Sequence, residues 1–366
     1  MSQNPLLAGI RVLDLSRLLP GPFCTLYFAQ LGAEIIKIEE PNGGDYARSL
    51  SAGLFALVNR GKKSVALDLR RAEEADAFRR LVKDADVVIE SFRPGVMDRL
   101  GCGYEVLRTI NPKLVYAALT GYGQTGPYRD RAGHDMNYLA YAGVLDQIGQ
   151  ADGPPVSANV QIADLAGGAL TCAVAVLAAV IGARASGQGT YVDVSMLDGT
   201  MALTALSAAA IRTIGHAMPR GRDMLSGGLA NYRIYETADG KHIACGALEL
   251  KFFANFCKAS SRPDLLTLPM SPGADGEPLR QALATLFKTR TRDEWEAALA
   301  DADCCVCGIY TPDEAQQNPQ VRERGFWSKV DGKLEFAFPV RYSNATTLGG
   351  AVPALGADTE TVLSNP

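Results

Sequence analysis

The chain has 366 residues, 47% of them hydrophobic and 21% charged, with a formal net charge of −4 at pH 7. Such a composition is typical of a globular protein, and the length suits two domains. The mild negative charge and the lack of a basic tract disfavour a nucleic-acid-binding surface, so an anionic ligand needs a local basic patch.

Two segments bear on targeting and membranes. Residues 1–5 are polar and lack the charged start of a secretory signal, so we expect no signal peptide. The uncharged run 165–183 is long enough to span a membrane, but Ala and Gly dominate it and it has no aromatic belt. We therefore predict a buried helix in a protein that does not associate with a membrane.

The eight cysteines fall into two groups. Five lie in apolar surroundings and predict buried thiols in a reducing compartment, hence a cytoplasmic protein. These five are Cys24, Cys102, Cys172, Cys245 and Cys257. Cys304, Cys305 and Cys307 cluster, but their spacing lacks the C-x-x-C loop and no partner pair is evident, so we predict no metal site.

Strand and helix patterns alternate along the first 200 residues. Strands are expected at 11–16, 34–39, 64–69, 87–92, 114–120 and 190–196, and helices at 23–31, 71–85 and 164–184. This alternation predicts a doubly wound α/β domain, whose ligands bind beyond the carboxyl ends of the strands. Loops 91–95 and 121–127 lie at such ends. The turn Pro20-Gly21-Pro22 is not the G-x-G-x-x-G of a dinucleotide site.

The rest of the chain has a different pattern. A polar, Arg- and Gly-rich loop at 220–228 suggests a domain boundary, and Asp239-Gly240 between two strand patterns predicts a hairpin. Thr291 and Thr311 each precede a Glu three residues later, which predicts two helix capping boxes. A short final helix is expected within 353–363.

Three titratable residues next to apolar segments are candidates for acid–base chemistry: His134, Asp164 and Glu249. Each has a structural alternative. A lone histidine more often satisfies local backbone groups, Asp164 is suited to cap a helix, and Glu249 is suited to a solvated strand end.

Several motifs resemble those of the family III CoA-transferase superfamily. They are Pro20-Gly21-Pro22, the loop 91–95, the segment 120–127, Asp-Val-Ser-Met-Leu-Asp-Gly at 193–199, and Leu355-Gly356. The resemblance implies a Rossmann-like large domain with a parallel sheet, a smaller α+β domain and an interlocked homodimer. We place the large domain at 1–196 and 335–366, a linker at 197–226, and the small domain with its return linker at 227–334.

Within the superfamily, residues 132–138 and 245–249 resemble segments of the α-methylacyl-CoA racemases. That resemblance implies that His134 and Asp164 exchange protons with opposite faces of the substrate α-carbon. It implies that Glu249, from a second chain, orients His134, and that the amide of Asp135 binds the thioester oxygen. Racemisation needs two such proton sites, and an enolate needs hydrogen-bond donors.

The candidate contacts for CoA are basic or aromatic residues: Phe92, Arg93, Arg99, Lys62 and Lys63. No cofactor is expected beyond the CoA part of an acyl-CoA substrate. The sequence departs from its relatives at Glu40, where many have a basic residue, and at Leu165, where racemases more often have Phe. The segment Leu229-Ala230-Asn231-Tyr232 also lacks a common Pro.

The sequence thus predicts a racemase that interconverts R and S 2-methylacyl-CoA thioesters by 1,1-proton transfer through an enolate. One alternative is a CoA-transferase that moves CoA between carboxylic acids through an acyl anhydride on Asp164. Another is a catalytically silent acyl-CoA-binding protein, which three polar groups in apolar settings disfavour.

Overall fold

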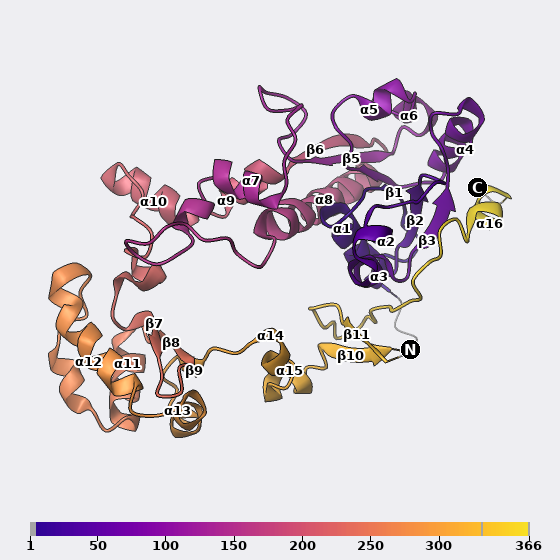
Figure 1. Ribbon diagram of the computed structural model, residues 1–366. Helices are drawn as coiled ribbons and strands as arrows, with labels where there is room; N and C mark the ends of the chain where they lie inside the picture. Colours follow the sequence, from indigo (N-terminus) through magenta and orange to yellow (C-terminus); the bar gives the residue numbers. More distant parts are fainter. Residues whose placement is uncertain (1–4, 331, 365–366) are drawn as a thin grey trace. The chain divides into compact units, whose positions relative to one another are not determined.

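The computed structural model describes residues 5–330 and 332–364, and its first 200 residues contain a six-stranded parallel sheet (Figure 1). Its strands are β1 (Arg11–Leu15), β2 (Glu34–Glu39), β3 (Lys63–Ala66), β4 (Val87–Glu90), β5 (Val115–Thr120) and β6 (Thr190–Ser195). Their order, β3-β2-β1-β4-β5-β6, reverses direction between β1 and β4, where doubly wound sheets bind ligands. The predicted α/β class and parallel sheet are confirmed.

Largely apolar runs explain the central strands β4 and β5, since strands covered on both faces need no polar alternation. All six residues of β5 are buried. The associated helices are α1 (Pro20–Gln30), α2 (Ala47–Leu50), α3 (Ala52–Asn59), α4 (Ala72–Val82), α5 (Val96–Arg99), α6 (Tyr104–Ile110), α7 (Asp135–Tyr141), η2 (Ala163–Leu170), α8 (Thr171–Ser186), α9 (Met196–Ala202) and α16 (Thr359–Ser364). A separate antiparallel hairpin joins β10 (Trp327–Val330) to β11 (Lys333–Phe336).

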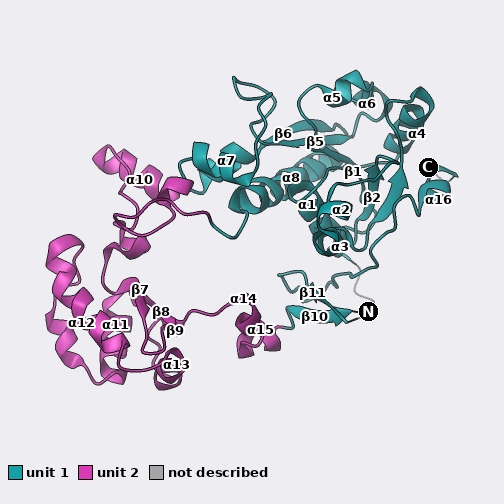
Figure 2. Cartoon of the chain, in the orientation of Figure 1, with its two compact units in different colours: residues 1–144, 158–204, 325–366 teal, residues 145–157, 205–324 magenta. Residues whose placement is uncertain are grey.

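The chain forms two compact units (Figure 2). The first comprises residues 1–144, 158–204 and 325–366, and the second comprises 145–157 and 205–324. The limits of the first unit at 204 and 325 lie within ten residues of the predicted 196 and 335. The second unit begins at 205 instead of 227, and it includes 145–157, which the prediction placed in the large domain. The domain limits stay a prediction, because a compact unit need not be an independently folding domain.

The second unit has a three-stranded antiparallel sheet, β7 (Tyr232–Glu236), β8 (His242–Gly246) and β9 (Val306–Gly308). Its helical segments are η1 (Leu145–Gln147), α10 (Ala205–Ile214), η3 (Met224–Gly228), α11 (Leu250–Ala259), η4 (Pro263–Thr267), η5 (Gly273–Gly276), α12 (Glu277–Phe287), α13 (Arg292–Leu299), α14 (Pro312–Ala315) and α15 (Pro319–Glu323). The hairpin at Asp239-Gly240 and the capping boxes at Thr291 and Thr311 are confirmed.

The apolar run 165–183 lies in a continuous helical segment, Ala163–Ser186, whose length and composition alone would allow it to cross a membrane. One side of it, including Val176 and Val180, is buried and packs on β5 and β6. The opposite side exposes 71% of Val174 and 70% of Ile181. The predicted buried helix is therefore buried on one side only.

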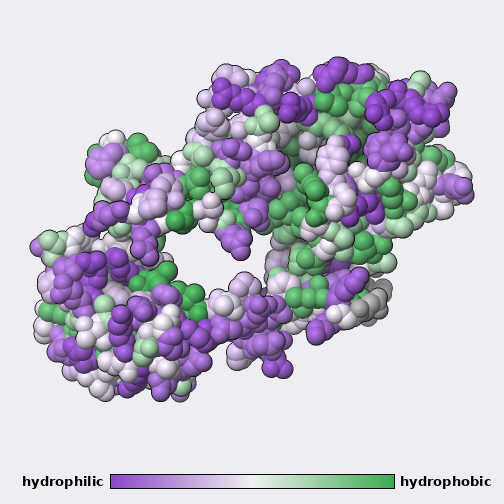
Figure 3. Space-filling model, viewed as in Figure 1, coloured by the Kyte–Doolittle hydropathy of each residue, from purple (hydrophilic) through white to green (hydrophobic). Residues whose placement is uncertain are grey.

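One face of the surface is mainly hydrophilic (Figure 3), and most of the cysteines are buried. On the face shown in Figure 3, both units carry mostly hydrophilic residues with smaller hydrophobic patches. The five cysteines predicted to be buried are free thiols and are buried; Cys304 is also buried, whereas Cys305 and Cys307 are exposed. Among residues 5–330 and 332–364, no group of three or more His, Cys, Asp or Glu side chains is placed to hold a metal ion.

Candidate active site and nucleotide pocket

His134 is the N-cap of α7, in the loop region that follows β5. Its backbone is extended (φ −130°, ψ 175°), and its N–H donates to Oδ1 of Asn137 at 3.0 Å. A side chain at the third helical position that reaches back to the N-cap amide is the second half of a capping box. The backbone of His134 is therefore fixed, whereas the residue itself is exposed.

Asp164 lies in the first turn of η2, a π-helix that runs directly into α8. The N-cap of η2 is Ile162, so the structural alternative in which Asp164 caps the helix is wrong. π-Helical turns are rare and occur often at functional sites. The N–H of Asp164 donates to Oδ1 of Asp135 at 3.0 Å, which joins the start of η2 to the residue after His134.

The carboxyl group of Asp164 has an unusually high proton affinity. Its pKa is raised from 3.8 to about 7, mainly by burial and in smaller part by the nearby Asp135 carboxylate. A helix N-terminus favours a charged carboxylate. Here desolvation outweighs that effect, so Asp164 titrates near neutral pH, where a general base is most effective.

Glu249 belongs to the second unit, where it follows β8 and is the N-cap residue of α11. It is exposed, and its carboxylate makes no hydrogen bond or ion pair with any residue in the described part of the chain. We expected all three titratable groups to lie in apolar settings. That expectation is wrong for His134 and Glu249 in the single chain and correct for Asp164.

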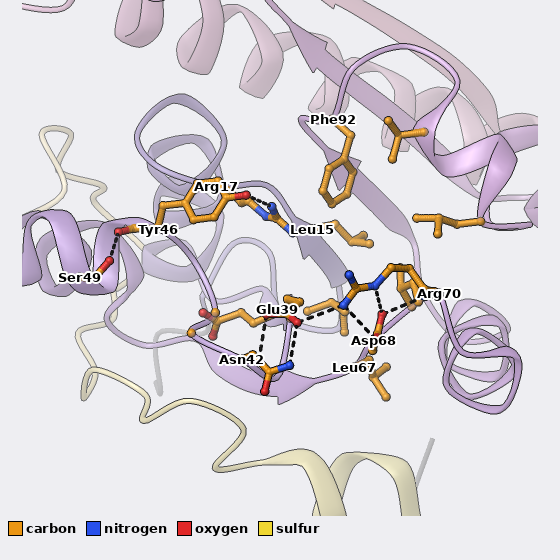
Figure 4. Close-up of a pocket in the computed structure, with 17 residues that line it drawn as sticks. Leu15, Arg17, Glu39, Asn42, Tyr46, Ser49, Leu67, Asp68, Arg70 and Phe92 are labelled. Carbon is orange, nitrogen blue, oxygen red and sulfur yellow. Dashed lines mark hydrogen bonds and ion pairs between the residues drawn. The ribbon is translucent and has the colours of Figure 1, made fainter.

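A pocket of about 620 Å³ lies in the first unit at the carboxyl ends of β1, β2, β3 and β4 (Figure 4). Arg17, which follows β1, forms part of its wall with Tyr46 and Phe92. Its guanidinium carbon lies 5.0 Å from the centre of the Tyr46 ring and 4.9 Å from that of Phe92. Its Nη1 also donates to the Tyr46 hydroxyl at 3.0 Å.

The other cation that lines the pocket, Arg70, is already paired (Figure 4). It donates to both carboxylate oxygens of Asp68, at 2.7 and 3.0 Å, and to Glu40 at 3.2 Å. Glu40, which follows β2, thus binds an arginine from the loop after the neighbouring strand β3. Two carboxylates therefore already neutralise Arg70. Arg17, by contrast, lines the pocket with no carboxylate partner among the described residues.

Of the five residues predicted to bind CoA, only Phe92 lines this pocket. Arg93 and Arg99 belong to the same segment and are exposed, but they do not line it. Both are free of ion pairs within the described residues, so they remain available at the surface beside α5.

Lys62 and Lys63 do not lie where a phosphate would reach them from the pocket. Lys62 is buried and donates to Asp14 at 3.2 Å and to Thr25 at 2.8 Å. Burial lowers the pKa of Lys62 to about 8, although the Asp14 carboxylate opposes that shift. Lys63 begins β3 and pairs with Glu34 at the start of β2, at the amino ends of the strands. Neither lysine lines the pocket, and both are already paired with carboxylates, so their assignment to CoA stays a prediction that these contacts disfavour.

Sequence reasoning missed Arg17, Tyr46 and Arg70. The available signal was their position, because each follows a predicted strand on the carboxyl side, where ligands of doubly wound sheets bind. The loop after β2 also contains Gly43-Gly44, and both glycines line the pocket.

Comparisons with known proteins agree with this architecture. Residues 7–359 match the model of CoA-transferase family III. The chain is 38% identical to the human alpha-methylacyl-CoA racemase over 87% of its length and 81% of that protein. It is 37% identical to a succinyl-CoA:mesaconate CoA-transferase of Haloarcula hispanica over 89% of its length and 85% of that protein.

A solved structure of a CAIB/BAIF family protein from Brucella suis is also similar. It is 29% identical, superposes with a TM-score of 0.88, and is covered over 99% of this chain and 100% of that one. The comparisons therefore support the family and the fold, but they include both racemases and transferases.

Proposed function

The chain belongs to CoA-transferase family III, and from that premise we propose that it is a 2-methylacyl-CoA racemase. The observation that carries the proposal is the hydrogen bond from the N–H of Asp164 to Asp135, which places a carboxyl group with a pKa of about 7 beside the segment bearing His134. A carboxyl group that titrates near neutrality and an imidazole on the adjoining segment suit a reaction needing one base and one acid.

In the proposed reaction, one of these two groups takes the α-proton of the thioester and the other donates a proton to the opposite face of the α-carbon. The thioester remains intact throughout, and the negative charge rests on the enolate oxygen between the two transfers. Asp135 is the first residue of α7, so its N–H has no partner within the helix. We assign that N–H to the enolate oxygen.

Glu249 is proposed to orient the ring of His134 from the second chain of a homodimer. Its exposed carboxylate, without a partner in the described chain, is free for such a contact. Refolding a mixture of His134→Ala and Glu249→Ala chains should restore part of the activity, because each mixed dimer would hold one intact site. No recovery in verified mixed dimers would place both groups on one chain.

CoA is proposed to bind the pocket beside Phe92, with Arg17 near a phosphate and with Arg93 and Arg99 at the surface. Arg–phosphate hydrogen bonds are charge-assisted, and an aromatic ring offers a stacking face to adenine. The free cysteines are compatible with a cytoplasmic location. CoA is part of the substrate, and no further cofactor is proposed.

The second candidate is a CoA-transferase, which the similarity to the Haloarcula hispanica enzyme favours. Asp164 would then attack the thioester carbonyl, expel CoA as a thiolate and form an acyl anhydride. We prefer the racemase because His134 and Glu249 supply a second proton site that a transferase does not need.

The test uses one enantiomer of a 2-methylacyl-CoA in deuterated water. The protein should introduce deuterium at the α-carbon and produce the other enantiomer. His134→Ala should lower racemisation by about 10²–10⁴-fold, the usual contribution of a general acid or base, with little change in CoA affinity. Full racemisation by His134→Ala would remove this residue from the mechanism.

A further inference from the structure

The peptide bond between Gly133 and His134 is held at both of its polar ends. Its carbonyl oxygen accepts a hydrogen bond from the Tyr138 hydroxyl at 2.6 Å, and its N–H donates to Oδ1 of Asn137 at 3.0 Å. The two side chains are neighbours on α7. We propose that Asn137 and Tyr138 form a peptide clamp that positions His134 for proton transfer; this inference rests on the proposed function.

The clamp is tightly packed on the side of Tyr138. That residue is 5% exposed, and its ring meets Tyr122 edge to face, with ring centres 5.2 Å apart. A Cβ on Gly133 would lie 2.7 Å from both the Tyr122 hydroxyl and the Tyr138 ring, and a Cβ on Gly121 would also overlap that ring. Glycines at these two positions let the loop approach close enough for the 2.6 Å hydrogen bond.

The phenol of Tyr138 is suited to donate. Burial raises its pKa above the ordinary value, and the negative charges of Asp164 and Asp135 add to that rise. The hydroxyl therefore keeps its proton throughout the neutral range. Tyr138 is therefore near both Asp164 and Asp135, the pair that is joined by the hydrogen bond from the Asp164 amide to the Asp135 carboxylate.

Fixing both ends of one peptide plane restricts the two backbone rotations on either side of it. The Cα–Cβ bond of His134 then leaves the backbone in one direction. Asp164 is positioned separately, by η2 and by its own hydrogen bond to Asp135. Loss of the clamp should therefore impair the His134 side of the reaction more than the Asp164 side.

The contributions of His134 and Asp164 can be measured separately with the two substrate enantiomers, because each of these bases removes the α-proton from one enantiomer. In Tyr138→Phe and in Asn137→Ala, racemisation should fall by about tenfold or more, because small misplacements of a reacting group can cost up to 10²-fold. Exchange of the α-hydrogen with deuterated water should fall for the enantiomer that His134 deprotonates. It should persist, with retained configuration, for the enantiomer that Asp164 deprotonates. KM should change little.

Matched variants separate positioning from general damage. Tyr141→Phe also removes a phenol hydroxyl from this aromatic cluster, but that hydroxyl contacts Arg131, so racemisation should stay near the wild-type rate. Asn137→Gln keeps an amide oxygen at the position where capping boxes commonly have Glu or Gln, and should recover part of the rate. Equal loss of exchange from both enantiomers would overturn the clamp.

A second readout does not depend on catalysis. Backbone amide hydrogen exchange of residues 133–138 should be faster in Tyr138→Phe and Asn137→Ala than in the wild type and Tyr141→Phe. Unchanged exchange in both variants would overturn the clamp, even if the protein is not a racemase. Absence of α-deuterium uptake by the wild type would instead contradict the proposed function.

Discussion

The pocket lined by Arg17 and Arg70 and the region around His134 and Asp164 lie in the same unit and differ in how their polar groups are paired. In the pocket, Arg70 is paired with two carboxylates, and Arg17 packs against two rings. Around His134 and Asp164, hydrogen bonds hold the backbone, while the two side chains have few partners. The side chains of the pocket are thus held by their neighbours, whereas near His134 and Asp164 it is the backbone that is held. If the proposed function is correct, the binding groups are preformed and the reacting groups are left free to accept and donate protons.

Asp164→Asn is the strongest test of this contrast. The amide has nearly the same shape but cannot act as a base, so racemisation should fall by about 10²–10⁴-fold while acyl-CoA affinity stays within a few-fold. Steady-state kinetics and equilibrium binding of CoA measure the two effects. A parallel loss of binding would mean that the two regions are not independent.

Lys62→Met tests whether this lysine is structural. The change leaves the Asp14 carboxylate buried without its 3.2 Å partner, and breaking a buried pair costs about 3–5 kcal/mol. We expect a lower free energy of unfolding in denaturant titrations, with KM for acyl-CoA unchanged in the folded protein. A large rise in KM with normal stability would return Lys62 to the CoA site.

The pH dependence of stability should reveal the buried carboxyl of Asp164. Its pKa of about 7 in the folded chain, against 3.8 as the ordinary value, means that the folded state binds the proton more tightly. This contribution is present below about pH 4 and is lost as pH rises to 7. Asp164→Asn should therefore be more stable than the wild type at pH 8, by up to about 4 kcal/mol, and equally stable at pH 4. Equal unfolding curves at both pH values would contradict the high pKa.

Arg17→Met removes the pocket-lining cation that has no carboxylate partner and keeps an apolar side chain between the two rings. Loss of a charge-assisted hydrogen bond to phosphate should cost about 1.5–3 kcal/mol, or roughly a 10–100-fold rise in KM with kcat nearly unchanged. Lys63→Met is the control, since Lys63 lies at the amino ends of the strands. A similar KM for both variants would place the phosphates elsewhere.

The sequence allowed prediction of the parallel sheet, the hairpin at Asp239-Gly240 and both capping boxes, because each depends on local patterns of apolar and turn-forming residues. It did not reveal the burial of Lys62, which belongs to a basic cluster in the sequence, because its position beside Asp14 depends on distant segments. The pairing of Arg70 with Glu40 also joins two strand ends thirty residues apart. Motifs identified the candidate catalytic residues, but only tertiary structure distinguishes the burial of Asp164 from the exposure of His134.

The most direct test of the central claim is the mass of the Asp164-containing peptide after turnover in the presence of hydroxylamine, with a 2-methylacyl-CoA as substrate and deuterated water as solvent. A racemase leaves the thioester intact, so this peptide should keep its unmodified mass while deuterium enters the substrate α-carbon. An Asp164 hydroxamate, together with transfer of CoA to an added free carboxylic acid, would contradict the racemase and establish the transferase reaction.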